Sequence, residues 1–158
     1  AVWEIVNKRH PDWVLEIYGK KDLSQNLDSL TRKLQLENTV SFFDPVKEVD
    51  KRYLESSIYV MTSRNEGFGM VLIEAMACGV PCVSFDCPSG PSDIIKNCED
   101  GLLIYNGDIE AFAKAIMHLI KNEELRKEMG AKAKENVKRY APDNVVPLWD
   151  ELFKSLVK

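Results

Sequence analysis

The chain has 158 residues, of which 45% are hydrophobic and 29% are charged, and its formal net charge at pH 7 is −4. This length favours one domain with a core of ordinary size, and the composition is that of a soluble globular protein. The net negative charge argues against nucleic acid as a partner. No apolar run approaches the roughly 18 residues that a membrane-spanning helix needs.

In chain order, short apolar runs alternate with segments of helical periodicity. The sequence predicts helix 2–9, strand 14–18, helix 23–36, strand 39–43, helix 47–56, strand 58–62, helix 69–78, strand 81–85, helix 89–96, strand 102–104 and helices 108–121, 123–140 and 143–157. Nearly continuous apolar strands separated by helices are typical of a doubly wound α/β fold, a mainly parallel sheet with helices on both faces. In such folds, ligands bind beyond the carboxyl ends of the strands.

Two acidic residues mark that edge of the predicted sheet. Glu66 follows the third predicted strand and precedes Gly67, Phe68 and Gly69, and Glu74 lies eight positions further on in a predicted helix. The glycines allow a ligand to approach the backbone closely, and the free N–H groups at the start of the helix favour an anion such as a diphosphate. We expect Glu66 to hold sugar hydroxyls and Glu74 to accept hydrogen bonds from a ribose diol.

The helix around Glu74 is apolar on every other side, so we expect it to be buried and its carboxylate to need a partner. A polyhydroxyl ligand would supply that partner, and a structural arginine, Arg52 or Arg64, is the alternative. Glu66 also has a simpler interpretation, as an acid favoured by the dipole of the following helix. Gly19 and Val46 follow the first two predicted strands and should open onto the same edge.

Cysteine and histidine usage gives no sign of a metal site. The four cysteines include no C-x-x-C pair, and there are two histidines, so we expect no zinc. We interpret the cysteines as reduced thiols of a cytoplasmic protein, and most simply as small core residues. The cysteines are Cys78, Cys82, Cys87 and Cys98.

Two helical segments near the end of the chain carry surface signals. Residues 121–139 interleave lysines and arginines with glutamates, which indicates a solvated helix with i,i+4 ion pairs; the alternative is peripheral contact with anionic lipid at the inner face of a membrane. The last helix has an apolar stripe, which we expect to pack on this domain or partly on a further one.

The segment from Ser63 to Val83, with Glu66 and Glu74 at the E-x7-E spacing, resembles the signature of retaining GT-B glycosyltransferases of the glycosyl transferases group 1, or family 4, type. The segments 15–19, 40–43, 88–95 and 100–104 resemble other parts of the same enzymes, so the likeness covers nearly the whole chain.

This resemblance implies that residues 1–158 form one nucleotide-sugar-binding domain, the Rossmann-like C-terminal half of a GT-B hexosyltransferase. The donor would be a UDP- or GDP-sugar, with no metal or other cofactor. Glu66 matches the catalytic, sugar-contacting acid and Glu74 the ribose-binding acid. The donor-binding loop corresponds to Gly67, Phe68, Gly69 and Met70, and Val46 falls near the base.

The same resemblance implies that an N-terminal acceptor domain and a first strand and loop, carrying Arg and Lys, lie outside this chain. The partner would be a saccharide or lipid-linked acceptor, in polysaccharide biosynthesis. Without the two cations that would stabilise the departing diphosphate, we expect the isolated chain to have negligible transferase activity. The alternatives are a GT-B sugar-nucleotide epimerase, a phosphorylase or a non-catalytic nucleotide-binding domain.

Overall fold

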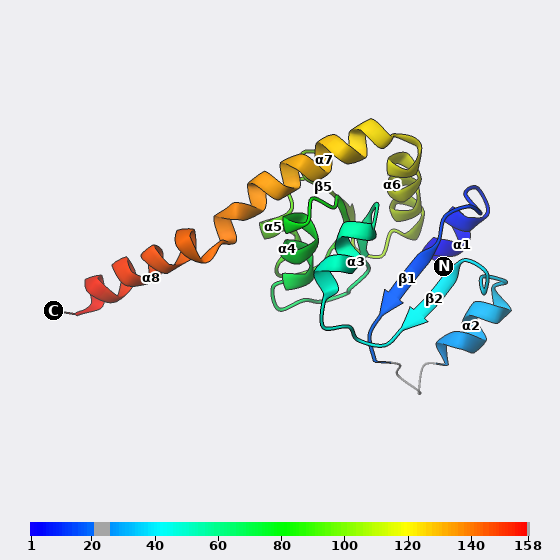
Figure 1. Ribbon diagram of the computed structural model, residues 1–158, viewed down its shortest axis with the longest axis horizontal. Coiled ribbons are helices and arrows are strands. Elements are labelled where there is room, and N and C mark those ends of the chain that lie inside the picture. Colours follow the sequence, from blue (N-terminus) through cyan, green and yellow to red (C-terminus); the bar gives the residue numbers. More distant parts are fainter. Residues whose placement is uncertain (21–25, 158) are drawn as a thin grey trace.

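The computed structural model describes residues 1–20 and 26–157 as an α/β fold, with every strand pairing parallel. Figure 1 shows the elements. The strands are β1 (Leu15–Tyr18), β2 (Val40–Phe43), β3 (Tyr59–Met61), β4 (Cys82–Asp86) and β5 (Gly101–Tyr105). The helices are α1 (Val2–Asn7), α2 (Leu27–Lys33), α3 (Val49–Glu55), α4 (Met70–Ala77), α5 (Pro91–Ile94), α6 (Ile109–Lys121), α7 (Glu123–Asn136), the 3-10 helix η1 (Val137–Tyr140) and α8 (Pro142–Leu156).

All five predicted strands are present, and each predicted helix has a counterpart within a few residues. The predicted helix 23–36 corresponds to α2, and its residues 23–25 lie outside the described residues. The predicted helix 123–140 divides into α7 and η1. None of the described helices is long and apolar enough to cross a lipid bilayer.

The strands form two hydrogen-bonded sheets rather than one continuous sheet in the part of the chain that the structure describes. β1 pairs with β2, and β3, β4 and β5 form a separate three-stranded sheet in that order. Figure 1 shows β1 and β2 to the right of the three-stranded sheet. The sequence predicted a single, mainly parallel sheet with helices on both faces. The parallel strand direction and the helical layers agree with this prediction, but β1 and β3 are not hydrogen-bonded to each other.

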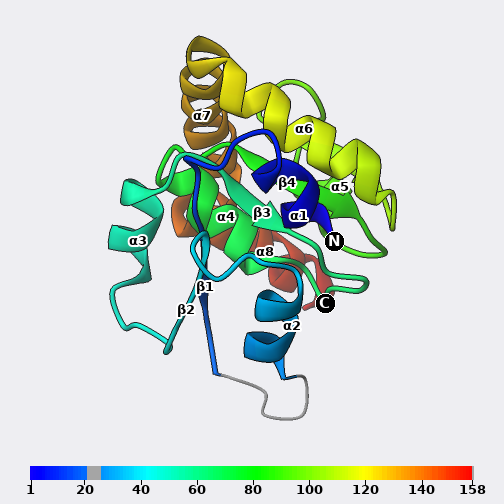
Figure 2. The same ribbon diagram turned by 90° about the vertical axis from the view of Figure 1, so that its right-hand side faces the viewer.

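Helices cover both faces of the three-stranded sheet, because side chains alternate along a strand. On β4, Cys82 contributes to a core cluster with α4, α5 and α7, whereas Val83 and Phe85 contribute to a second cluster with α1 and α6. Figure 2 shows α1 and α6 on one side of β3 and β4 and α4 on the other. The doubly wound architecture is thereby confirmed.

Local sequence explains where the central helix ends. Gly79 adopts a positive φ of 78°, and the N–H of Val80 donates to the carbonyl of Ala75 at 3.1 Å. This is the Schellman arrangement, in which a glycine in a left-handed conformation ends a helix and satisfies its last carbonyls. The α4 helix therefore runs only from Met70 to Ala77, with its N-terminus at the loop that follows β3.

Candidate functional site

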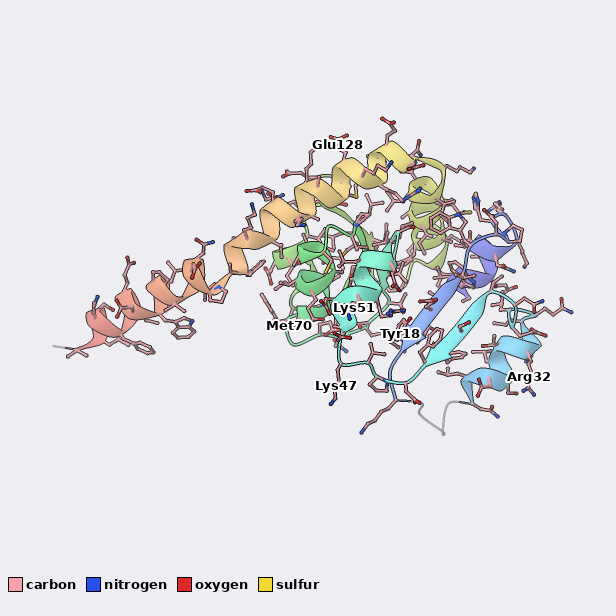
Figure 3. All side chains as sticks on the ribbon, viewed as in Figure 1. Tyr18, Arg32, Lys47, Lys51, Met70 and Glu128 are labelled. Atoms are coloured by element: carbon pink, nitrogen blue, oxygen red, sulfur yellow. The ribbon has the colours of Figure 1, made fainter. Side chains whose placement is uncertain are left out.

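The carboxyl edge of the strands gathers the residues that the sequence singled out. Gly19 directly follows β1, and its N–H donates to the carbonyl of Phe43, the last residue of β2, at 3.0 Å. Val46 lies three residues beyond β2 and is exposed. Figure 3 shows Tyr18, Lys47 and Met70 on the lower side of the view, the side to which β1 and β2 point. The structure therefore places the three predicted loops at one edge.

The loop between β3 and α4 combines exposed side chains, among them Asn65 and Phe68, with a buried glycine at the start of the helix. Gly69 is the residue before the first turn of α4 and adopts a positive φ of 93°, which a residue with a side chain rarely does. No side chain caps the helix, so the N–H groups of Met70 and Val71 remain available to a ligand, whereas the N–H of Leu72 donates to the carbonyl of Gly69 at 2.9 Å. An anion placed there would also meet the positive end of the helix dipole.

Glu66 lies half-buried in this loop. Among the described residues, its carboxylate makes no hydrogen bond or ion pair. Its charge acts on two neighbours: burial raises the pKa of the Cys87 thiol and the Glu66 carboxylate raises it further, and burial, the Cys82 thiol and Glu66 together raise the pKa of the Tyr59 hydroxyl. A half-buried acid without a protein partner can accept hydrogen bonds from a hydroxylated ligand.

Glu74 occupies a different setting from the one expected. Its side chain is exposed, as are those of Met70 and Ala77 on the same helix, so the expectation that α4 is buried on all sides is wrong. The partner of the carboxylate is the hydroxyl of Tyr53, which donates to Oε2 at 3.1 Å. Neither Arg52 nor Arg64 forms an ion pair with it within the described residues.

Tyr53 is a site residue that the sequence reasoning missed. It lies on α3, its ring packs edge-on against Tyr59 with centroids 5.6 Å apart, and burial is the main cause that raises its pKa above the usual range. The hydroxyl therefore remains a protonated donor toward Glu74 at any ordinary pH. The sequence offers little signal for this contact, because Tyr53 and Glu74 are 21 positions apart.

Three further residues contact the loop between β3 and α4, and the sequence did not predict these contacts. The side-chain amide of Asn106 donates to the carbonyl of Arg64 at 3.3 Å. Gly90 lies so close to the loop that a Cβ there would be 1.8 Å from the carbonyl oxygen of Phe68. The ring of Tyr140 contacts the Phe68 ring edge-on, with centroids 5.6 Å apart. The conformation of this loop is therefore set by segments far along the chain.

The two hollows described next lie away from the 66–74 segment, and the described residues include no metal-binding group. A hollow of about 380 Å³ lies between α2 and β2, and one of about 240 Å³ lies near the start of β4; neither is lined by a residue of the 66–74 segment. The described residues contain no group of three or more His, Cys, Asp or Glu side chains placed to hold a metal ion.

Comparison with known proteins defines the class. Residues 1–136 match the family described as glycosyl transferases group 1, and the chain belongs to that family. It is 38% identical over 149 residues to an exopolysaccharide phosphotransferase of Streptomyces coelicolor, covering 94% of this chain and 16% of that protein. It is 35% identical over 148 residues to an uncharacterized glycosyltransferase of Haemophilus influenzae, covering 94% of this chain and 42% of that protein.

Solved structures agree with this assignment. The crystal structure of a Staphylococcus aureus TarM mutant in complex with fondaparinux, α-GlcNAc-glycerol and UDP superposes with a TM-score of 0.91 at 33% identity. The match covers 96% of this chain and 31% of that one. The fold is that of the GT-B glycosyltransferases, and this chain spans less than half of the length of each of these three proteins.

Proposed function

We propose that this chain is the donor-binding, C-terminal part of a retaining, metal-independent glycosyltransferase that transfers a hexosyl group from a nucleotide sugar to an acceptor hydroxyl. The observation that carries the proposal is the arrangement of two acids around one glycine loop. Glu66 lies half-buried without a partner among the described residues, and Glu74 is exposed on α4. Between them lie Gly67, Phe68, Gly69 and Met70, at the open start of the helix.

This arrangement suits the two ends of a nucleotide sugar. The N–H groups of the first turn of α4 would bind the diphosphate, Glu66 the sugar, and Glu74, oriented by Tyr53, the ribose diol. Gly19 and Val46 would face the base. The UDP in the TarM mutant complex supports a uridine donor, with a GDP-sugar as the alternative.

The chemistry asked of these residues is electrostatic. The bond between the anomeric carbon and the diphosphate oxygen breaks, a bond to the acceptor oxygen forms on the same face, and the acceptor proton passes to the leaving phosphate. The carboxylate of Glu66 would stabilise positive charge at the anomeric carbon, and the α4 amides would stabilise the departing diphosphate. Neither role requires a metal ion.

An upstream segment would complete the domain. A doubly wound dinucleotide-binding sheet has the strand order 3-2-1-4-5-6. The orders β2-β1 and β3-β4-β5 match strands 3-2 and 4-5-6, which leaves the place of strand 1, between β1 and β3, empty. Among the described residues of 11–20 and 26–48, only Leu36 and Thr39 are buried, and Ile17 of β1 is 39% exposed, so this half has little core of its own. We assign the position between β1 and β3 to a parallel strand from the polypeptide before Ala1.

The last helix points to a further domain. Figure 1 shows α8 extending away from the rest of the molecule. Its apolar residues are exposed, from 47% for Leu152 to 70% for Leu156. An apolar face of this size calls for a covering surface. We assign that surface to an N-terminal domain that binds a saccharide or lipid-linked acceptor. The exposed residues are Val146, Leu148, Trp149, Leu152, Phe153 and Leu156.

The setting that we propose is polysaccharide biosynthesis in the cytoplasm, at the inner face of the membrane. The exopolysaccharide phosphotransferase relative supports the pathway class. The four described cysteines are free thiols, as is usual for a cytoplasmic protein. The family match and the relatives favour a transferase over a GT-B epimerase or a non-catalytic nucleotide-binding domain, and a transfer assay separates the proposal from both, because neither would transfer a glycosyl group.

Calorimetric titration with UDP, GDP and ADP tests the binding part of the proposal, on a chain extended upstream of Ala1. We expect Glu74→Gln to weaken UDP binding by about 10- to 100-fold, because a charge-assisted hydrogen bond contributes about 1.5–3 kcal/mol. The matched control is Glu110→Gln, which neutralises an exposed acid in the first turn of α6. Equal affinities for the two variants would contradict the assignment.

Transfer by the longer enzyme tests the catalytic part. We expect Glu66→Ala to lower kcat strongly and Glu74→Ala to act chiefly on donor KM, while 5 mM EDTA (about a thousandfold excess over enzyme) leaves the rate unchanged. The isolated 158-residue chain should show negligible turnover. Measurable turnover by that chain, or loss of activity in the chelator, would refute the corresponding part of the proposal.

A further inference from the structure

The aromatic contact between Phe68 and Tyr140 joins the donor loop to the far end of the chain. Tyr140 is the last residue of η1, and Ala141 alone separates it from α8. Its ring meets the Phe68 ring at an interplanar angle of 82° and a centroid distance of 5.6 Å. This edge-to-face geometry is the favourable one for two aromatic rings.

Tyr140 is itself firmly held. Its hydroxyl donates to the carbonyl of Asp93 at 2.7 Å, and the guanidinium of Arg139 lies 4.6 Å from its ring centroid. Arg139 donates to the carbonyl of Ile94 at 2.6 Å and to that of Asp93 at 3.2 Å. These bonds satisfy carbonyls at the end of the short helix α5 and fix η1 against it.

The same helix α5 also contacts the loop. Gly90, which precedes α5, lies against the backbone of Phe68, and the Cδ1 atom of Ile94 is 3.6 Å from the Cβ position of Gly69. Gly90 therefore packs against the backbone of Phe68, and the Tyr140 ring packs against its side chain. Its neighbours in the chain are the residues assigned to the sugar and the diphosphate.

We propose that Tyr140 is a positioning residue, which fixes Phe68 and thereby orients Glu66 and the first-turn amides of α4 for the donor. The effect on the donor rests on the proposed function, whereas the effect on the loop does not. Ala141 alone separates Tyr140 from α8, so this ring also lies next to the helix whose apolar side chains are exposed.

Hydrogen–deuterium exchange of residues 62–69 in the ligand-free 158-residue chain tests the effect on the loop. We expect Tyr140→Leu to accelerate exchange of this segment by up to about tenfold, as loss of an aromatic pair implies. Tyr140→Phe keeps the ring and should leave exchange close to that of the unchanged chain. Unaltered exchange in Tyr140→Leu would overturn the proposal.

The control separates positioning from general loss of stability. Met129→Ala removes a buried side chain from α7 in the other core cluster, away from the loop. We expect it to lower stability without accelerating exchange at 62–69; equal acceleration in both variants would show that Tyr140 is merely structural. Should Tyr140→Leu fold poorly, Phe68→Leu removes the same contact from the other side and must produce the same local change.

UDP affinity of the longer enzyme then tests the consequence for the donor. We expect Tyr140→Leu to weaken UDP binding by about 3- to 10-fold and Tyr140→Phe to restore it. Accelerated loop exchange with unchanged affinity would overturn the link to the donor. Absence of UDP binding by the unsubstituted enzyme would instead refute the proposed function, and the exchange result would still decide the role of Tyr140 in the loop.

Discussion

Replacement of Gly90 by alanine is the sharpest perturbation of the donor loop that the structure offers. A Cβ at this position would lie 1.8 Å from the carbonyl oxygen of Phe68 and 2.5 Å from its carbonyl carbon. Contacts under 3.0 Å essentially never occur for a real Cβ, so the carbonyl must retreat by about 1.2 Å. The atoms in the way are backbone, which cannot rotate aside as a side chain would.

The expected cost has two parts. Gly90 has a φ of 106°, a conformation that costs a residue with a side chain about 1–3 kcal/mol. Forcing the loop outward adds about 1–3 kcal/mol, the usual range for overpacking. We therefore expect Gly90→Ala to lower the free energy of unfolding by about 2–6 kcal/mol in urea denaturation. In the longer enzyme, a displacement of this size would lower the transfer rate by as much as about 100-fold.

Gly107 provides the matched control. Its φ of 90° is similar, but a Cβ there would have no atom within 4 Å. Gly107→Ala therefore carries the conformational cost alone, and the difference between the two variants isolates the collision with Phe68. Equal unfolding free energies for the two variants, together with equal nucleotide affinity, would refute the reasoning.

Three further results are expected. Gly130→Ala should lower the free energy of unfolding in urea by about 1–3 kcal/mol, because the added Cβ would lie 2.1 Å from the carbonyl oxygen of Gly79. Alanine favours helices, so helix propensity alone would predict the opposite sign. A stabilised variant would contradict this close approach. Burial raises the folded-state pKa of the Tyr59 hydroxyl, so the unfolded state loses this proton at a lower pH than the folded state does. The free energy of unfolding should therefore fall as the pH rises above about 10. Alkaline denaturation should show a shallower fall for Tyr59→Phe. Iodoacetamide at pH 8 should modify exposed Cys98 well before Cys82, whose thiol pKa burial raises; mass spectrometry that found Cys82 modified first in the folded chain would contradict the packing.

Most of the secondary structure follows from local patterns. The alternation of short apolar runs and helical periods located all five strands, and Gly79 with Pro81 marked the end of α4. Strand direction and the two helical layers follow from that alternation as well, because parallel strands need helical crossovers. These features depend on residues that are neighbours in the sequence.

The errors concern contacts between distant segments. The apolar composition around Glu74 suggested burial, but Met70 and Ala77 lie on an open face, where apolar side chains are common. The Tyr53 partner, the approach of Gly90 to Phe68 and the ring of Tyr140 join segments separated by 21 or more positions. The periodicity of a sequence carries no information about contacts between such distant segments, so only the three-dimensional structure reveals the residues that fix the loop conformation.

The uneven distribution of the core has a consequence for nucleotide choice. The half that carries Glu66 and Glu74 rests on two well-packed clusters, whereas the half that carries Gly19 and Val46 buries few side chains. Segments with little buried apolar surface open at lower free energy than the core does. In the 158-residue chain, the carbohydrate end of the donor would thus meet a rigid surface, whereas the segments that face the base would be held loosely. The upstream strand proposed between β1 and β3 would pack against those segments, so the choice of nucleotide would depend on that strand.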